Sequence, residues 1–192
     1  RAAQESNPDR PESHYNIGIL EVSLRRFKQA EDAFHRALEI DPAFVPAAVN
    51  LANLLQSTGR DAEGEPILRA IVAERPEDPS ARLALGFWLT RTGQREAALD
   101  ELRRAAEYGT AAPRFGYVYA VALADSGDTA EAMRVLEETL ERFPYDRDSL
   151  IALAVYEQQA GNLAAAREHA ALLLELEPND ASIRDFVNQL GR

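Results

Sequence analysis

Apolar and small residues recur at the three- and four-residue spacing of an amphipathic helix, and this pattern repeats every 34 residues. One series of similar segments, at residues 14, 48, 82, 116 and 150, reads HYNIGILEV, AVNLANLLQ, RLALGFWLT, GYVYAVALA and LIALAVYEQ. A second series, at residues 30, 64, 98, 132 and 166, reads AEDAFHRAL, GEPILRAIV, ALDELRRAA, AMRVLEETL and AREHAALLL. We therefore predict five consecutive copies of two helices each, at 11–44, 45–78, 79–112, 113–146 and 147–180.

Small residues fill two columns of this repeat, where the two helices of a copy are expected to cross. The columns read Gly18, Ala52, Gly86, Ala120, Ala154 and Ala30, Gly64, Ala98, Ala132, Ala166. A larger side chain at either position pushes the two backbones apart. Large apolar residues beside these columns, such as Ile17 and Phe34 in the first copy, are expected to fill the core next to the crossing.

Glycine and proline mark the ends of the predicted helices. The glycines at the turn after each first helix are Gly59, Gly93, Gly127 and Gly161, and the prolines after the second helices are Pro42, Pro76, Pro144 and Pro178. Glycine tolerates the positive φ of a helix C-terminus, and proline cannot continue a helix. Pro66 lies inside the second helix of the second copy, so this helix is expected to start late or to kink.

The segments outside the five copies have different compositions. Residues 1–10, RAAQESNPDR, are expected to form a disordered lead. Residues 181–192 predict a further helix that caps the last copy, with Ile183, Phe186, Val187 and Leu190 on one face. Because the first residue is Arg1, we expect a processed protein or a region of a longer one.

The repeat resembles the tetratricopeptide-repeat family, whose helix-turn-helix unit has a characteristic residue pattern. The first copy matches this pattern at Ile17-Gly18, Ala30, Phe34, Ala37 and Pro42, and the resemblance extends over residues 11–180. It implies an all-α, right-handed α-solenoid that acts as a noncatalytic protein-interaction module. In this family, the concave surface is lined by the first helix of each repeat.

Composition excludes several other classes of function. The net charge of −11 argues against binding to a phosphate backbone, so no nucleic acid partner is expected. No apolar run approaches the ~20 residues that span a bilayer, and we expect no direct membrane insertion. Without cysteine, these residues form no disulfide, cysteine zinc site or covalent haem attachment, although the compartment, bacterial cytoplasm or periplasm, stays open.

Motifs of catalysis and cofactor binding are also missing from the sequence. It contains no glycine-rich phosphate loop, no nucleophile elbow and no pair of histidines at metal-binding spacing. The three histidines, His14, His35 and His169, fall on different repeat positions. We therefore expect neither an enzyme nor a cofactor.

The resemblance places the fifth and ninth residues of each copy on the inner surface. The fifth residues are Tyr15, Val49, Leu83, Tyr117 and Ile151, and the ninth are Ile19, Asn53, Phe87, Val121 and Val155. Nine of these ten are apolar, and a contiguous apolar stripe in contact with water is typical of a binding site. Alternatively, the fifth residues are half buried between neighbouring repeats, and the ninth are covered by the chain's own tail or by another copy.

Two asparagines, Asn16 and Asn50, occupy the sixth position of successive copies. In similar proteins this asparagine hydrogen-bonds the main chain of an extended peptide, whereas the alternative is an ordinary solvated side chain. Chaperone-binding members clamp a C-terminal carboxylate with lysines on the inner helices. Because the inner helices here carry no lysine, we do not expect a chaperone C-terminal tail as the ligand.

Two arginines, Arg91 and Arg114, occupy inner positions of adjacent copies. If they are free, they form an anion anchor beside Phe87. Alternatively, they are neutralised one copy further on by Asp125 and Asp148.

The sequence thus predicts a groove that binds a peptide or partner helix through apolar anchors. A first alternative is a self-associating scaffold in which the apolar stripe joins copies of the chain into a homo-oligomer. The segments AAPRFGYVYAVALADSG and PYDRDSLIALA are also similar to the repeat arrays of bacterial multihaem cytochrome c proteins. This second resemblance implies an accessory domain in the periplasm, with a redox domain before Arg1.

Overall fold

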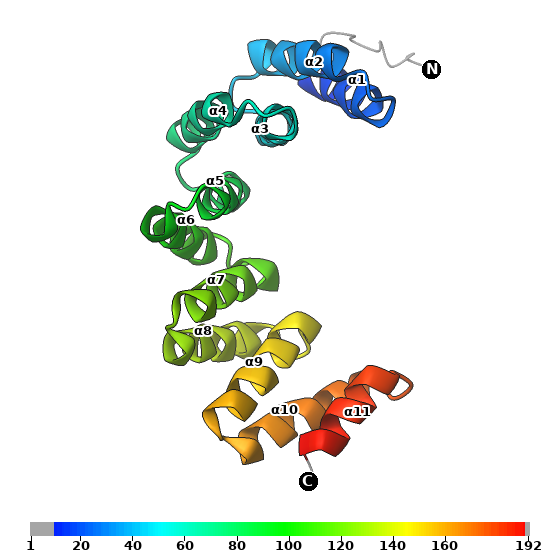
Figure 1. Cartoon of the computed structure of the whole chain (residues 1–192), viewed down its shortest axis with the longest axis vertical. Helices are drawn as coiled ribbons and strands as arrows, with labels where there is room; N and C mark the ends of the chain where they lie inside the picture. The colour runs from blue at the N-terminus through cyan, green and yellow to red at the C-terminus, as the bar shows by residue number, and fades with distance from the viewer. Residues whose placement is uncertain (1–9, 191–192) are drawn as a thin grey trace, which may run out of the picture. The chain divides into compact units, whose positions relative to one another are not determined.

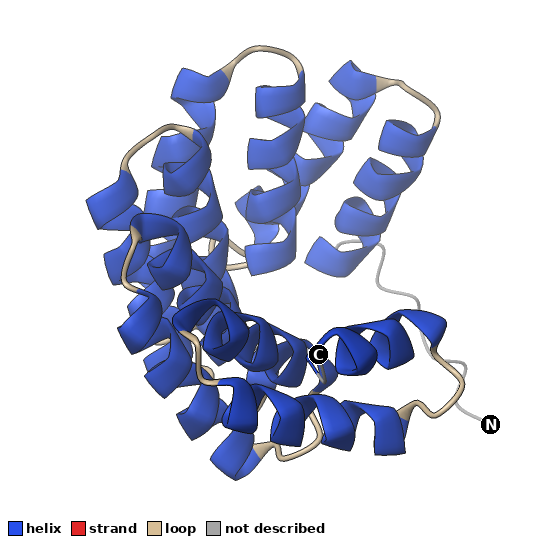
Figure 2. Ribbon diagram, turned by 60° about the horizontal axis from the view of Figure 1, so that its bottom comes forward, coloured by secondary structure: helices blue, strands red, loops and turns tan. Residues whose placement is uncertain are grey.

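The computed structural model describes residues 10–190, which form eleven α-helices and no strand (Figures 1 and 2). The helices are α1 (Pro11–Ser23), α2 (Phe27–Ile40), α3 (Val45–Ser57), α4 (Asp61–Glu74), α5 (Pro79–Arg91), α6 (Arg95–Tyr108), α7 (Pro113–Ser126), α8 (Thr129–Arg142), α9 (Arg147–Ala160), α10 (Leu163–Leu176) and α11 (Ala181–Leu190). All but Arg10 of the predicted disordered lead, and residues 191–192 of the predicted capping helix, lie outside the described residues. The chain forms two compact units, which divide between Gly93 and Gln94.

Several helices begin where their sequence satisfies the free N–H groups of the first turn. Asp78 accepts hydrogen bonds from the N–H groups of Ser80 and Ala81 at 2.8 and 2.9 Å. Asp146 and Asp180 cap α9 and α11 in the same manner. Pro11, Pro46, Pro79 and Pro113 occupy the first or second position of their helices, where proline's missing N–H leaves no bond unmade.

The expectation that α4 starts late because of Pro66 is wrong. The helix begins at Asp61 and continues through the proline to Glu74. Two of its buried residues, Gly64 and Leu68, lie on opposite sides of Pro66. The helix must therefore already be formed before the proline, because Gly64 packs against Trp88 of α5. Tertiary packing therefore overrides the local preference of proline for the first turn.

The two columns of small residues are buried at all ten positions. A Cβ on Gly18 would lie 2.4 Å from Cε1 of Phe34, a ring on α2 of the same helical pair. A Cβ on Gly64 would lie 2.3 Å from Cη2 of Trp88, which belongs to α5 of the next pair. Gly64 therefore makes room between pairs of helices, a role that the predicted crossing within one pair did not include.

The core of the first unit contains one exception to the predicted apolar columns. Phe34, Leu51 and Leu55 are buried together between α2 and α3. Ile17, which occupies the same repeat position as Leu51, is 47% exposed. Leu51 is covered by α2, the helix that precedes its own pair, and no helix among the described residues precedes α1.

The second unit is built around an apolar cluster that extends from α7 to α11. Leu136, Leu150, Leu153 and Leu173 are buried in it, and Ile183 adds a contact from α11. At the far end of α11, Leu190 packs against small buried residues of α10, and its carbonyl accepts a hydrogen bond from Arg167 Nε at 2.6 Å. The apolar face predicted for α11 thus covers α10.

Glycine has a conformational role at four of the five turns between paired helices. Gly59, Gly93, Gly127 and Gly161 have φ angles of 77°, 78°, 99° and 84°, in the left-handed region where a Cβ is unfavourable. The first pair has Arg25 at this position, with φ of 58°. Arg25 is the one residue other than glycine with positive φ in the described part of the chain.

We expect Arg25→Gly to stabilise the protein by about 0.5 kcal/mol, because relief of the left-handed strain exceeds the entropy that glycine adds to the unfolded chain. The reciprocal control is Gly59→Arg, which should destabilise by about 1 kcal/mol. No atom lies within 4 Å of a Cβ on Gly59, so its cost would be purely conformational. Urea denaturation measures both free energies of unfolding, and a destabilised Arg25→Gly variant would show that the arginine side chain holds the turn.

Candidate functional site

An open hollow of about 280 Å³ lies in the first unit, between α3 and α5. Its lining residues are Val49, Asn53, Leu68, Ala84, Phe87, Thr90 and Arg91. Val49 and Asn53 are four residues apart on α3, as are Phe87 and Arg91 on α5, so each pair projects from one face of its helix. The hollow is therefore a direct product of the helical repeat.

Phe87 is the large apolar group at the surface of this hollow, with 45% of its area exposed. Its neighbour Trp88 is fully buried, because successive residues of a helix face different directions and Trp88 points toward Gly64. Phe87 is therefore not part of the buried core. Together with Val49, Leu68 and Ala84, the ring offers a mainly apolar surface to a side chain that enters the hollow.

Arg91 and Asn53 form the polar side of the hollow. Arg91 Nη2 donates a long hydrogen bond to Asn53 Oδ1 at 3.4 Å, and the guanidinium lies 5.4 Å from the centre of the Trp88 ring. Both side chains are exposed. A bond of this length is weak, so the guanidinium can exchange it for a stronger acceptor without a large loss.

The structure brings together four residues of the predicted groove, namely Val49, Asn53, Phe87 and Arg91. Leu83 is half buried but does not line the hollow. On α1, Asn16 and Ile19 are both exposed. Tyr15 is half buried against Phe34 and Phe44, with ring centres 6.1 and 5.7 Å away. Tyr15 is therefore half buried against aromatic rings of its own copy.

Asn50 is partly engaged within its own helix. Its Nδ2 donates a hydrogen bond of 2.9 Å to the carbonyl of Pro46, one turn earlier on α3. A peptide main chain would have to compete for this donor, so the predicted ladder of Asn16 and Asn50 stays a prediction.

The remaining predicted groove residues belong to the second unit. Tyr117 and Ile151 are half buried against its core cluster, and Val121 and Val155 are also half buried. Arg114 is exposed, with its guanidinium carbon 4.5 Å from the centre of the Phe115 ring. Because Arg91 and Arg114 belong to different units, their joint anion anchor stays a prediction, as does the pairing of Arg91 with Asp125.

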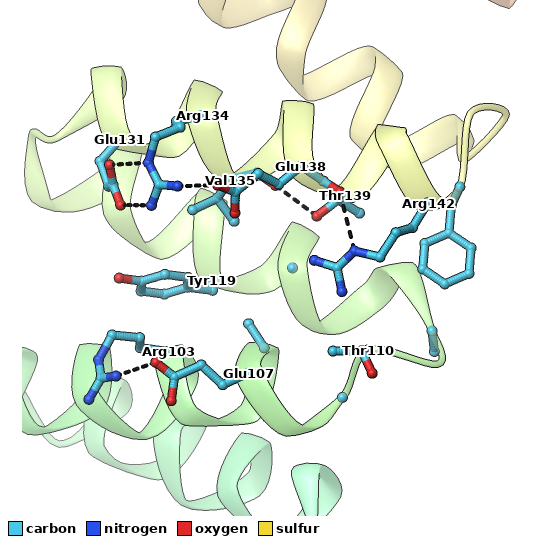
Figure 3. A pocket seen from close by; sticks show the side chains of 15 residues that line it. Arg103, Glu107, Thr110, Tyr119, Glu131, Arg134, Val135, Glu138, Thr139 and Arg142 are labelled. Atoms are coloured by element: carbon cyan, nitrogen blue, oxygen red, sulfur yellow. Dashed lines mark hydrogen bonds and ion pairs between the residues drawn. The ribbon is translucent and has the colours of Figure 1, made fainter.

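A second hollow, of about 400 Å³, lies in the second unit among α6, α7 and α8 (Figure 3). Gly116 is among its lining residues. Tyr119 stands between Arg103 on one side and Arg134 on the other (Figure 3). Burial raises the pKa of the Tyr119 hydroxyl. This hollow was not predicted from the sequence.

Two of the three arginines that line this hollow are neutralised by carboxylates. Arg103 pairs with Asp100 at 2.8 Å and also with Glu107, and Arg134 pairs with Glu131 and with Glu138. The hydrogen bond from Arg134 holds the pKa of the Glu131 carboxyl below its usual value. The third lining arginine, Arg142, donates from Nε to the backbone carbonyl of Glu138 at 3.4 Å.

One column of the repeat contains part of the information about this hollow. Gly116 corresponds to Arg82 in the previous copy and to Leu150 in the next, both of which are buried. The Arg82 side chain fills its position and donates from Nε to the carbonyl of Pro76 at 2.5 Å. Glycine instead leaves room for the side chain of Thr139, whose Oγ1 stands 2.2 Å from where a Cβ on Gly116 would lie.

The sequence analysis also missed a buried polar pair between α9 and α10. Glu157 is 5% exposed, and its Oε2 lies 3.0 Å from Nδ1 of His169. The pair is not part of a larger cluster of metal-binding residues, because the described residues contain no group of three or more His, Asp or Glu side chains that could hold a metal ion. Its contacts assign it to packing between the two helices.

Comparison with known sequences decides the family. A profile described as tetratricopeptide repeat (TPR) matches residues 21–79 and 123–190, and a second profile with the same description matches residues 89–147. The chain belongs to the tetratricopeptide-repeat family. The chain is similar to human protein O-mannosyl-transferase TMTC3, at 24% identity over 91% of this chain, and to cellulose synthase operon protein C of Salmonella typhimurium, at 27% identity over 81% of this chain. The aligned regions make up 21% and 14% of those two proteins.

Solved TPR structures share the fold. MamA superimposes with a TM-score of 0.68 at 20% identity, covering 90% of this chain and 94% of MamA. YrrB superimposes with a TM-score of 0.66 at 20% identity, covering 96% of this chain and 95% of YrrB. Yeast Tom70 superimposes with a TM-score of 0.78 at 18% identity, covering 97% of this chain and 40% of Tom70. The predicted fold class, an all-α solenoid of TPR helix pairs, is confirmed. None of the described helices is long and apolar enough to cross a membrane.

Proposed function

We propose that this TPR chain is a noncatalytic interaction module that takes an apolar side chain of a peptide or partner helix into the hollow between α3 and α5. The TPR fold suggests protein–protein interaction in general. The observation that carries the specific proposal is Phe87, a large aromatic ring that is 45% exposed at the edge of a mainly apolar hollow. An aromatic residue with apolar neighbours is typical of the energetic centre of an interface.

The polar side of the hollow would orient the ligand. Arg91 can exchange its 3.4 Å bond to Asn53 for a carbonyl or carboxylate oxygen of the ligand, because a charge-assisted hydrogen bond is shorter and stronger. Asn53 then has its amide available for the ligand's main chain. The crystal structure of YrrB is described as that of a TPR protein with an unusual peptide-binding site, which supports a peptide as the ligand.

Self-association through the same hollow is the second candidate, and the exposed ring of Phe87 favours it equally well. Light scattering over a concentration series separates the two, since a peptide receptor stays monomeric and a scaffold does not. The accessory role in a larger periplasmic redox protein stays a prediction.

Selection from a library of random peptides tests the proposal. We expect the enriched peptides to share a large apolar residue and to bind the purified chain in a fluorescence anisotropy assay. Asn53→Lys should weaken this binding by about tenfold or more, because a cation in the hollow opposes the entry of an apolar group. Asn53 is exposed, so the fold should tolerate the lysine. Peptides that bind both proteins equally well would refute the proposed site.

A further inference from the structure

The hollow among α6, α7 and α8 contains residues that depart from the pattern of the repeat. Five of its lining residues differ in type from their counterparts in the other four copies, namely Thr110, Gly116, Tyr119, Thr139 and Arg142. Thr110 stands where the other copies have proline, and Tyr119 where they have leucine or isoleucine. No other copy has a cation at the position of Arg142. Because the other copies form their helical pairs without these residues, the fold of the repeat does not explain them.

Two of the departures add a hydroxyl to a column that is otherwise apolar. Thr139, whose counterparts are alanine, isoleucine and leucine, is buried and donates to the carbonyl of Val135 at 2.8 Å. Its oxygen can therefore accept a hydrogen bond from a ligand. The hydroxyl of Tyr119 makes no hydrogen bond with a described residue. The hollow thus offers polar groups that the packing of the helices does not use.

Arg142 is the lining arginine that pairs with no carboxylate among the described residues. Arg103 and Arg134 each pair with two carboxylates. The Nε group of Arg142 makes only the 3.4 Å bond to the carbonyl of Glu138, and a bond of this length is weak. Its two Nη groups are therefore available to an anion, which a guanidinium can hold through two parallel hydrogen bonds.

Charge differs along the length of this hollow. Figure 3 shows Arg142 at one end and Tyr119 at the other. Apart from Arg142, the charged lining residues are two arginines and three glutamates, which leaves one negative charge in excess. The nearest of these glutamates along α8 is Glu138, one helical turn or about 6 Å from Arg142. A positive and a negative group of one short ligand would therefore both find a partner.

We infer that this hollow binds a small zwitterionic molecule, with a carboxylate and an ammonium group at opposite ends of a short aliphatic chain. The carboxylate would pair with Arg142 and the ammonium group with Glu138. The aliphatic chain would lie against Val135 and Ala112. The volume of about 400 Å³ is within the range of small-molecule sites. This site lies in the second unit, and it does not depend on the proposed peptide site of the first.

Titration of the full chain with 6-aminohexanoate, followed by the amide chemical shifts in NMR spectra, tests this inference. We expect saturable binding, with shift changes confined to residues that line the hollow and their neighbours. Hexanoate and hexylamine each lack one of the two charged groups, so they should bind about tenfold more weakly. Arg142→Gln should weaken the binding of 6-aminohexanoate by about tenfold, because the carboxylate loses its charged partner.

The matched control is Arg184→Gln, because Arg184 is an exposed arginine of the same unit that does not line the hollow. It removes the same charge and should bind 6-aminohexanoate as the unaltered chain does. Absence of binding, equal binding by the two variants, or equal affinity for hexanoate would overturn the inference. A peptide with a C-terminal lysine that binds more than about tenfold tighter would assign the hollow to a protein tail, and would also overturn it.

Discussion

Replacement of Gly64 by leucine is expected to destabilise the first unit by about 3 kcal/mol, at the upper end of the usual cost of overpacking a core. The Cβ alone would stand 2.3 Å from Cη2 of Trp88 and within 3 Å of two further atoms of that ring. Trp88 is fully buried, so the ring has no solvent-exposed space into which it can move. Denaturant unfolding gives the free energy directly.

Ala70→Leu is the matched control, since Ala70 is exposed on the same helix. It should change the free energy of unfolding by less than about 0.5 kcal/mol. The substitution Trp88→Leu in the Gly64→Leu background should recover part of the loss, because it removes the atoms that clash. If Gly64→Leu and Ala70→Leu had equal effects, the packing of α4 on α5 would be wrong.

Phe87→Ala is expected to weaken binding of a selected peptide by about 2 kcal/mol, or roughly 30-fold, the usual threshold for the energetic centre of an interface. The ring supplies the main apolar surface of the hollow, and alanine leaves a wider, shallower depression. Since nearly half of the ring is already exposed to water, its removal should cost the fold about 1 kcal/mol at most. Affinity should therefore fall much more than stability.

Tyr145→Ala is the control for this substitution. Tyr145 is 68% exposed in the second unit, so its truncation removes an exposed aromatic ring that does not line the hollow. Binding and thermal unfolding of both variants are measured on the same preparations. A Phe87→Ala protein that is clearly destabilised but binds normally would assign the ring to packing and remove the main support for the peptide site.

Much of the fold was predictable because the same pattern of buried and turn positions recurs in all five copies of the repeat. The columns of small residues identify the helix crossings, because only small side chains fit there. The turn glycines identify the turns, because those positions need a positive φ angle. Ile17 was wrongly expected in the core. Leu51, at the same repeat position, is covered by α2, whereas no described helix takes the corresponding place before α1. The late start expected from Pro66 was wrong, because packing on both sides of the proline outweighs its local preference for the first turn.

The candidate site was predictable to the extent that it follows helical spacing. Val49, Asn53, Phe87 and Arg91 share the hollow because they occupy inner positions of neighbouring helices. The distinction between exposed Phe87 and half-buried Tyr15 depends on which rings lie nearby, here Phe34 and Phe44. The hollow above Gly116 needed the volumes of several side chains at once, which one column of the sequence does not supply.

Amide hydrogen exchange with and without a selected peptide tests the central claim most directly. Ligand contact slows the opening of the helices that form a site. We predict that the peptide increases protection in residues 49–57 of α3 and 84–91 of α5, with little change in α6 to α8. Protection confined to the hollow among α6, α7 and α8, or to α1 and α2, would contradict the assignment of the peptide site to Phe87 and its neighbours.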